Sequence, residues 1–218
     1  MVEPAVWQEV DDYWNGFLLD DDPALDAALA ANVAAGLPPI GVSAAQGKLL
    51  HLLARSIGAS RILEVGTLGG YSTIWLARAL RPDGQLISCE IDPHHAEVAA
   101  ANVARAGLAS AVDIRVGPAI DTLASLEGPF DLAFIDADKA SNTEYFQHAL
   151  RMSRPGGMII VDNVVRGGAV VDAAVTDANV MGVRRLAAAL AEEKRVEATV
   201  VQTVGAKDYD GFVLAVVR

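Results

Sequence analysis

The chain has little that would support a disulfide framework or a nucleic-acid surface. Its 218 residues include a single cysteine, Cys89, so no disulfide can form within the chain, and this usage is typical of a reducing compartment. Cys89 lies in an apolar run, which predicts a position in the core. The formal charge of -11 is not offset by any clustered stripe of lysine and arginine, so we expect no nucleic-acid partner.

Long hydrophobic runs are also missing. No segment reaches the ~18 uncharged apolar residues that a membrane-spanning helix requires, and residues 1–12 lack the basic and then apolar pattern of a signal peptide. We therefore expect a cytoplasmic protein without a membrane partner. Aromatic residues make up only 6% of a chain that is 52% apolar, which suits one α/β domain packed with alanine, valine, leucine and isoleucine.

The first part of the chain predicts helices. One covers residues 5–19, and a second begins at Pro23, a residue favoured in the first turn of a helix. A third helix is marked by Ser43 and Gln46, which have the spacing of a capping box, and by Gly58, which provides a stop. We expect residues 1–58 to form a helical N-terminal cap on a core of residues 59–218, within a single domain.

From residue 61 onward, short apolar runs alternate with helical segments, which is the pattern of parallel βαβ units. The predicted strands are residues 61–65, 85–91, 112–116, 131–135, 158–161, 196–204 and 211–217. The predicted helices are residues 71–80, 93–106, 119–126, 141–153 and 176–193. Ser141 and Glu144 have the spacing of a capping box at the start of one of them. The short turn at residues 205–210 requires the last two strands to run antiparallel.

Four predicted strands end on carboxylates, among them Glu64, Glu90, Asp136 and Asp162. If these strands are parallel neighbours in one sheet, their carboxyl ends share one edge. An open α/β sheet binds its ligands at that edge. We therefore expect the four acids to surround a common site.

A glycine-rich loop follows the first predicted strand. Residues 64–72 read Glu-Val-Gly-Thr-Leu-Gly-Gly-Tyr-Ser, and such a loop lets a ligand approach the backbone at the start of a helix. The spacing differs from the Gly-x-Gly-x-x-Gly of dinucleotide sites, so NAD is a poor fit. Glu64 would repel a pyrophosphate but tolerate the ammonium and sulfonium of S-adenosylmethionine, and Glu90 could accept both hydroxyls of a ribose. The turn at Ala119 either lines the adenine or is a bare turn.

The acids after two later strands predict a cation site. Asp136, Asp162 and Asn163 supply three oxygen donors, which suit Mg²⁺. Zinc would prefer nitrogen or sulfur, and the four histidines form no ligand-spaced group with the lone cysteine. A nearby divalent cation disfavours the ammonium form of a lysine, so Lys139 is a candidate general base. The alternative is that Lys139 is only a surface ion-pair partner of Asp136 or Asp138.

These motifs resemble, in the same order, those of the cation-dependent small-molecule O-methyltransferases, a family that includes catechol and caffeoyl-CoA O-methyltransferases and their bacterial relatives. The resemblance covers roughly residue 40 to the end and rests on residues 64–72, 134–139, 161–163 and 209–212. It implies an α/β fold with a Rossmann-like seven-stranded methyltransferase sheet, mostly parallel with an antiparallel last strand and helices on both faces. It also implies a homodimer and a small aromatic substrate.

The resemblance also assigns roles to residues. Asp136, Asp162 and Asn163 would bind Mg²⁺, with Mn²⁺ or Ca²⁺ as alternatives, and the catalytic residues would be Lys139, as the base, and Asp136. The residues implied to bind S-adenosylmethionine are Val42, Glu64, Gly66, Thr67, Ser72, Glu90, Ala119, Asp136 and Asp138.

One position departs from the plant branch of this family, which has an asparagine touching the substrate where this chain has Gly167. Recognition of a plant-type acyl-CoA is therefore not implied. The segments around Arg166 and Tyr209 form either the rim of the substrate site or solvated loops. The leading hypothesis is a metal-assisted O-methyltransferase for a vicinal dihydroxy aromatic substrate. The alternatives are a nucleotide-linked oxidoreductase on a Rossmann-like fold and a non-catalytic S-adenosylmethionine-binding module.

Overall fold

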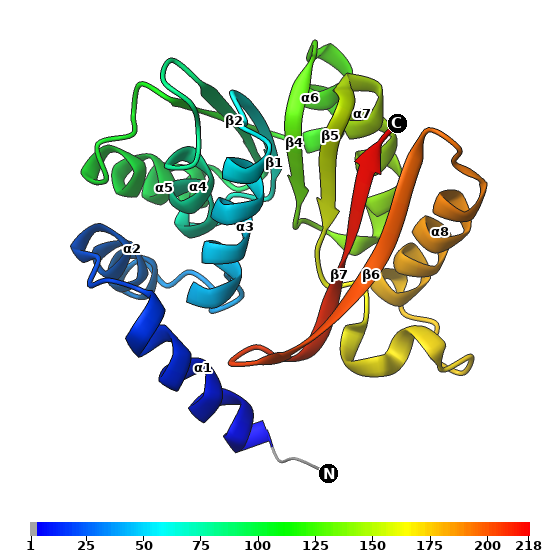
Figure 1. Ribbon diagram of the computed structural model, residues 1–218, viewed down its shortest axis with the longest axis horizontal. Helices are drawn as coiled ribbons and strands as arrows, with labels where there is room; N and C mark the ends of the chain where they lie inside the picture. Colours follow the sequence, from blue (N-terminus) through cyan, green and yellow to red (C-terminus); the bar gives the residue numbers. More distant parts are fainter. Residues whose placement is uncertain (1–3) are drawn as a thin grey trace.

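The sheet at the centre of the computed structural model, which describes residues 4–218, has seven strands in the order β3-β2-β1-β4-β5-β7-β6 (Figure 1). The strands are β1 (Arg61–Val65), β2 (Gln85–Glu90), β3 (Val112–Val116), β4 (Phe130–Ile135), β5 (Ser153–Val161), β6 (Val196–Gly205) and β7 (Asp208–Val217). β1 to β5 pair in parallel, whereas β7 runs antiparallel to both β5 and β6. The predicted mostly parallel sheet with an antiparallel last strand is confirmed.

The helices begin and end close to their predicted positions. They are α1 (Pro4–Leu18), α2 (Pro23–Ala34), α3 (Ala44–Ser56), α4 (Tyr71–Ala77), α5 (Pro93–Arg105), α6 (Ala119–Ser125), α7 (Asn142–Met152) and α8 (Ala178–Glu192), with 3-10 helices η1 (Lys139–Ser141) and η2 (Arg166–Val171). Within residues 4–218, no helix is both long and apolar enough to cross a membrane.

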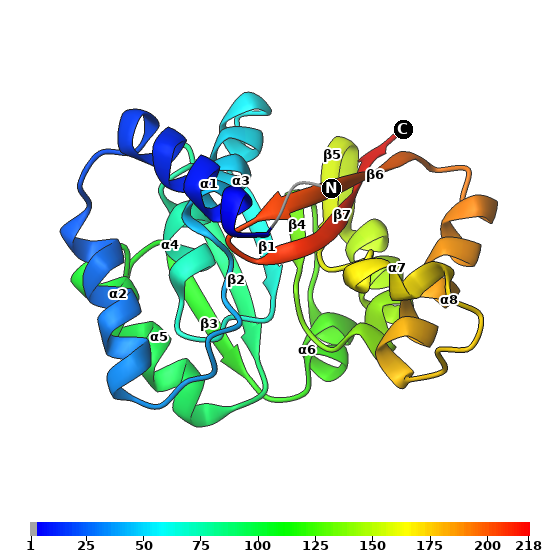
Figure 2. The same ribbon diagram turned by 90° about the horizontal axis from the view of Figure 1, so that it is seen from below.

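Hydrophobic cores lie on both faces of the sheet, because parallel strands between two helical layers are buried on both sides. Along β1, Ile62 packs with residues of α2 to α5, whereas its neighbour Leu63 packs with residues of α6 to α8. Figure 2 shows these two groups of helices on opposite sides of the sheet. Cys89 is 1% exposed in the second core, which confirms the predicted core position.

The tip of the β6–β7 hairpin lies against the helical start of the chain (Figure 1). The backbone N–H of Ala206 donates to the Asp11 carboxylate at 2.8 Å, and Lys207 Nζ donates to the carbonyl of Pro39 at 3.0 Å. Because β6 runs in the same direction as β1 to β5, this tip is at the carboxyl edge of the sheet. The N-terminal helical segment and the β6–β7 turn therefore meet beside the edge where the predicted site residues gather.

Two capping predictions need correction. Ser43 does cap α3, accepting from the Gln46 N–H at 3.2 Å, but the Gln46 side chain extends to Asp162 rather than back to the cap. Ser141 makes no side-chain cap, and Asp138 accepts from its N–H at 3.1 Å instead. In both places a residue at the carboxyl edge of the sheet replaces a contact that the capping-box spacing predicted within the helix. That residue is Asp162 for Gln46 and Asp138 for Ser141.

Candidate active site

Two hollows are prominent in the structure. The larger, about 930 Å³, lies at the carboxyl edge of the sheet, and the smaller, about 490 Å³, is an apolar groove between α8 and β6. The larger cavity is lined by most of the predicted site residues: Val42, Gly66, Thr67, Ser72, Glu90, Ala119, Asp136, Asp138, Lys139 and Asn163. Because only this cavity combines carboxylates, a lysine and glycine-loop backbone, it is the candidate active site.

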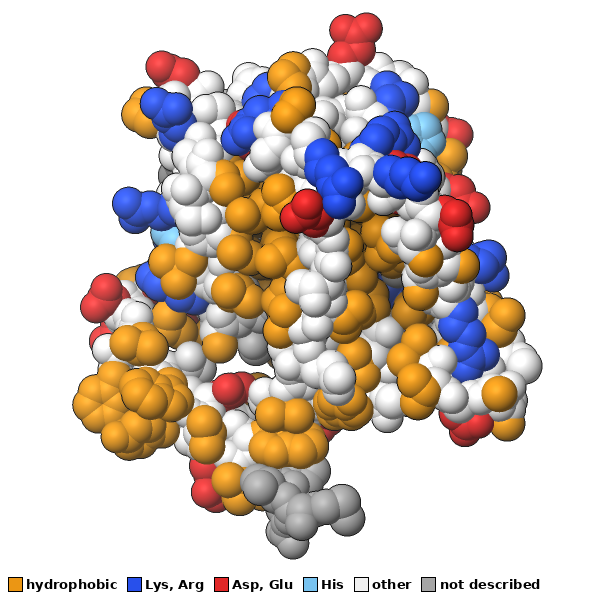
Figure 3. Space-filling view, turned by 45° about the vertical axis from the view of Figure 1, so that its right-hand side comes forward, with side chains coloured by type: hydrophobic (Ala, Val, Ile, Leu, Met, Phe, Trp, Pro, Cys, Tyr) orange, Lys and Arg blue, Asp and Glu red, His pale blue; other side chains and the backbone are white. Residues whose placement is uncertain are grey.

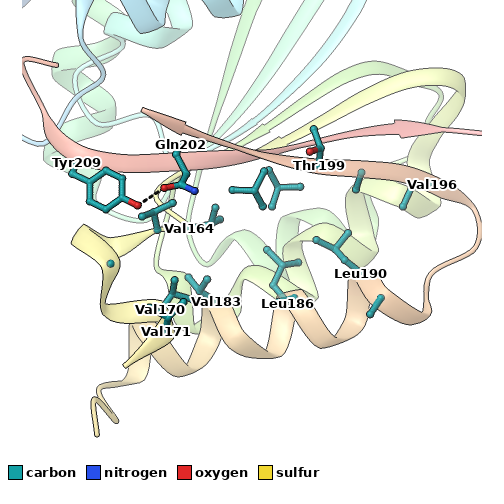
Figure 4. Close-up of a pocket in the computed structure, with 17 residues that line it drawn as sticks. Val164, Val170, Val171, Val183, Leu186, Leu190, Val196, Thr199, Gln202 and Tyr209 are labelled. Atoms are coloured by element: carbon teal, nitrogen blue, oxygen red, sulfur yellow. Dashed lines mark hydrogen bonds between the residues drawn. The ribbon is translucent and has the colours of Figure 1, made fainter. Parts of the chain in front are cut away.

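The apolar groove contains little polar chemistry. Hydrophobic side chains gather in it (Figure 3), and Figure 4 shows valine and leucine side chains from α8 and β6 facing its interior. Tyr209 lies at one end, where its hydroxyl donates to Gln202. Tyr209 lines this groove and not the larger cavity, whereas Arg166 lines the larger cavity and Gly167 lines neither.

The glycine loop lies against Asp136 at Gly66. Its φ of +100° lies in a region that favours glycine, and a Cβ there would be 2.1 Å from the carbonyl oxygen of Asp136. The Gly66 N–H donates to the carbonyl of Cys89 at 2.9 Å, and the Asp136 N–H donates to that of Val65 at 2.8 Å. The ends of β1, β2 and β4 are thus joined by backbone hydrogen bonds at the point where the two predicted half-sites meet.

Glu90 is tied to the glycine loop by its carboxylate. One oxygen accepts from the N–H groups of Thr67 and Leu68 at 3.1 and 2.7 Å, and the other accepts from the Asp92 N–H at 3.0 Å. His95, in the first turn of α5, is half-buried, with Nδ1 3.7 Å from the Glu90 carboxylate. The Asp92-Pro93 pair marks the start of α5 directly after β2. It could therefore have indicated that the first turn of α5, with His95, lies near Glu90 at the end of that strand.

Glu64 lies behind the cavity wall rather than in the cavity. Its carboxylate is fully buried and accepts hydrogen bonds from the hydroxyls of Ser72, Thr73 and Ser88, each at 2.6 Å. Burial raises the pKa of Glu64 to about 7, although the three hydroxyl donors act in the opposite direction. Of these partners, Ser72 also lines the cavity, so Glu64 acts on the site by orienting that serine.

We expect Glu64→Gln to remove part of the pH dependence of stability. The Glu64 pKa rises from 4.5 to about 7 on folding, so the folded state binds this proton more tightly and the unfolding free energy falls as pH rises through that window. Between these two pKa values the unfolding free energy of the wild type should fall by roughly 3 kcal/mol more than that of the variant. Denaturant unfolding of both proteins at pH 5 and pH 8 measures this difference, and parallel pH curves would contradict the prediction.

Lys139 forms an ion pair with Asp136 at the cavity wall. Lys139 Nζ donates to Asp136 Oδ1 at 2.7 Å, and the lysine side chain is only 8% exposed. The alternative predicted an ion pair with Asp136 or Asp138 at the surface. The pair with Asp136 is present, but it is buried at the cavity wall. A buried lysine with one carboxylate partner beside a cavity is suited to exchanging a proton with a ligand.

Asp162 and Asn163 follow β5, the strand next to β4. Asp162 accepts from the Gln46 amide at 2.6 Å and from the Asn163 N–H at 2.8 Å. Burial and the nearby charge of Asp136 raise the pKa of Asp162 to about 7. Asn163 adopts a left-handed φ of 56° directly after the strand, and its side chain lines the cavity.

This donor set fits a hard divalent cation. Two carboxylates and one amide oxygen come from neighbouring strand ends, and a cation would offset the repulsion between Asp136 and Asp162. In residues 4–218 no group of three or more histidine, cysteine, aspartate or glutamate side chains is arranged to hold a metal. A site here would therefore need a ligand of another type, and Asn163 offers an amide oxygen.

The segment after Asn163 is held by Asp210, a residue of the 209–212 motif whose role the sequence alone did not indicate. One Asp210 oxygen accepts from the N–H groups of Val165, Arg166 and Gly211, each at 2.9 Å. Gly211 must be small because a Cβ there would lie 2.4 Å from the carbonyl oxygen of Val201. The motif thus anchors the loop that follows Asn163 to the β7 strand.

Known proteins share both the sequence and this arrangement. The family model described as O-methyltransferase matches residues 13–216. A catechol O-methyltransferase of Mycobacterium tuberculosis is 54% identical over 211 residues, 96% of each chain. An O-methyltransferase from Bacillus cereus, solved in complex with SAH, superposes with a TM-score of 0.97 at 48% identity, over 99% of this chain and 100% of that one.

A second solved structure gives the same result. The O-methyltransferase TomG from Streptomyces achromogenes, involved in tomaymycin synthesis and solved in complex with SAM, has a TM-score of 0.96 at 52% identity, over 100% of this chain and 99% of that one. The match to the family model extends over almost the whole chain, and so does the likeness in structure. This chain belongs to the O-methyltransferase family.

Proposed function

We propose that this enzyme is an S-adenosylmethionine-dependent, divalent-metal-assisted O-methyltransferase acting on a small aromatic substrate with adjacent hydroxyls. The observation that carries the proposal is that the buried Lys139–Asp136 pair after β4 and Asn163 after β5 line the same cavity as the glycine loop. Asp162, next to Asn163, is buried at 3% exposure. A relative named catechol O-methyltransferase and solved relatives in complex with SAM and SAH support it.

The cofactor would occupy the half of the cavity beside β1 and β2. There Gly66 and Thr67 line the cavity, and Glu90 supplies a carboxylate for ribose hydroxyls. Ala119 would lie against the base, and Asp138 would reach the amino group. Asp138 is held for this by Tyr145, whose hydroxyl donates to it at 2.5 Å.

The metal would be held by Asp136, Asp162 and Asn163, at the ends of β4 and β5. When bound, Mg²⁺ would supply Lewis-acid stabilisation of negative charge on the substrate hydroxyl oxygens. Asp136 then has two partners, since it also pairs with Lys139. This shared carboxylate would keep the base close to the oxygen that reacts.

Lys139 would accept the proton of one substrate hydroxyl. That oxygen forms a bond to the methyl carbon, the carbon–sulfur bond of the sulfonium breaks, and S-adenosylhomocysteine leaves. The chain contributes mainly by holding the reacting atoms in line, and such positioning can supply roughly 7 to 11 kcal/mol.

Mass spectrometry of a panel of catechols incubated with S-adenosylmethionine, with Mg²⁺ or with EDTA, tests the proposal. We expect a gain of one methyl group only in the arm with Mg²⁺. Methylation that survives EDTA would contradict the metal mechanism, and binding of the cofactor without any product would favour a non-catalytic binding module. Nicotinamide fluorescence on titration with NADH checks the oxidoreductase alternative, for which we expect no change.

A further inference from the structure

Gln46 makes a contact that neither its sequence context nor the predicted site explains. It lies in the first turn of α3, 116 residues away from Asp162, yet its Nε2 donates to Asp162 Oδ2 at 2.6 Å. The glutamine is half-buried and Asp162 is 3% exposed. A hydrogen bond to a buried carboxylate is worth more than one to an exposed group.

Residues around Gln46 hold α3 close enough for this contact. Ser43 caps the helix through the Gln46 N–H. Gly47 lies directly under Trp75 of α4, where a Cβ would be 2.3 Å from the indole ring. One turn further on, His51 Nδ1 is 3.1 Å from the carbonyl of Trp75. The small residue beside Gln46 therefore lets α3 pack closely against α4, and in this position the Gln46 amide reaches Asp162 at the end of β5.

The chemistry of an amide suits this position. An ionised carboxylate only accepts hydrogen bonds, so the glutamine must present its NH₂ group to Asp162. With Asn163 N–H on one oxygen and Gln46 on the other, the carboxylate is held from both sides while each oxygen keeps a further acceptor position. Because the amide is neutral, it leaves the negative charge of Asp162 available to a cation, whereas a lysine would offset it.

We infer that Gln46 is a positioning residue for the divalent cation site: it orients the Asp162 carboxylate through a hydrogen bond and so couples the N-terminal helices to the metal. The inference rests on the metal centre of the proposed function. Groups that orient metal ligands from outside the coordination shell typically change metal affinity by 10- to 100-fold when they are lost. The Gln46 side chain donates to Asp162 and makes no hydrogen bond to Lys139 or Asp136, so its effect should appear in metal binding first.

The test is Mn²⁺ affinity, measured by electron paramagnetic resonance of free Mn²⁺, for the wild type, Gln46→Met and Asp162→Asn. Methionine keeps the length of glutamine without an N–H donor. We expect Gln46→Met to weaken Mn²⁺ binding by about 10- to 100-fold. Calorimetric binding of S-adenosylhomocysteine should be unchanged, which shows that the fold and cofactor site are intact. Gln147→Met, an exposed glutamine on α7, is the matched control and should bind Mn²⁺ like the wild type.

The outcomes separate this inference from the proposed function. Suppose that the wild type binds Mn²⁺, that Asp162→Asn abolishes this binding and that Gln46→Met leaves it unchanged. This result would overturn the role of Gln46 and leave the metal centre standing. A wild type that binds no Mn²⁺ would overturn the metal centre and this inference with it. If Gln46→Met no longer binds S-adenosylhomocysteine, Gln46→Asn replaces it: the shorter amide cannot reach Asp162, and Mn²⁺ affinity as high as that of the wild type would again overturn the inference.

Discussion

Replacing Lys139 by alanine is expected to reduce kcat by about 10²- to 10⁴-fold, the usual contribution of a general base. The lysine side chain is buried at the cavity wall with Asp136 as its ion-pair partner, so no solvent-exposed base can substitute for it. Affinity for S-adenosylhomocysteine should be nearly unchanged, because the glycine loop and Glu90 are untouched. Single-turnover kinetics at saturating Mg²⁺, with calorimetry of cofactor binding, measure the two effects separately.

Lys139→Arg distinguishes a base from a fixed positive charge. Arginine can keep the ion pair with Asp136 but stays protonated in proteins, so it cannot accept the hydroxyl proton. We expect this variant to be about as inactive as Lys139→Ala. Lys48→Ala is the control, because Lys48 lies over the Trp75 ring and outside the cavity. Near-normal turnover in Lys139→Arg would show that the charge of Lys139 matters and that its basicity does not.

Gly66→Ala is expected to be the most damaging single-methyl change in the cofactor half of the site. The added Cβ would lie 2.1 Å from the Asp136 carbonyl oxygen and 2.8 Å from its carbon, and φ is +100°. Backbone strain and overpacking each cost about 1 to 3 kcal/mol, so the unfolding free energy should fall by roughly 2 to 6 kcal/mol. Relief by moving β4 away from β1 would separate the glycine loop from Asp136 and weaken cofactor binding. Chemical denaturation and S-adenosylhomocysteine calorimetry measure both effects.

Gly107→Ala is the matched control for this variant. Gly107 also has a left-handed φ, of +75°, but a Cβ there meets nothing within 4 Å. Its substitution should show the cost of backbone strain alone, about 1 to 2 kcal/mol, and leave cofactor binding unchanged. If the two alanine variants were equally stable and bound S-adenosylhomocysteine equally well, the close approach of Gly66 to Asp136 would have no role in the site.

Local sequence was sufficient for most of the fold. Alternating apolar runs, N-caps and glycine stops predict helices and strands within a few residues, because these signals act over one or two turns. The edge on which Glu90, Asp136 and Asp162 meet could also be predicted, since the carboxyl ends of parallel strands share one side of a sheet. The homodimer and the cytoplasmic location stay predictions.

Local spacing was misleading where a side chain has a partner far away in the chain. Gln46 fits a capping box by spacing, in which its side-chain oxygen would accept from the Ser43 N–H, but its amide instead donates to a buried carboxylate 116 residues away. Tyr209 lines the apolar groove, whereas its neighbour Asp210 holds the loop after Asn163, because successive residues of a strand point to opposite faces of the sheet. No short-range sequence pattern shows which distant residue a side chain will contact in the folded protein.

The sequence by itself determined which residue types are available and in which order: a glycine loop, Glu90, Asp136, Lys139, Asp162 and Asn163. Their identity and their place at strand ends are local properties of the chain. The tertiary structure alone decided that Glu64 lies behind Ser72, that Gln46 reaches Asp162, and that Gly66 touches Asp136. These contacts depend on how closely helices and strands pack, and packing distances are set by side-chain volumes from distant parts of the chain together.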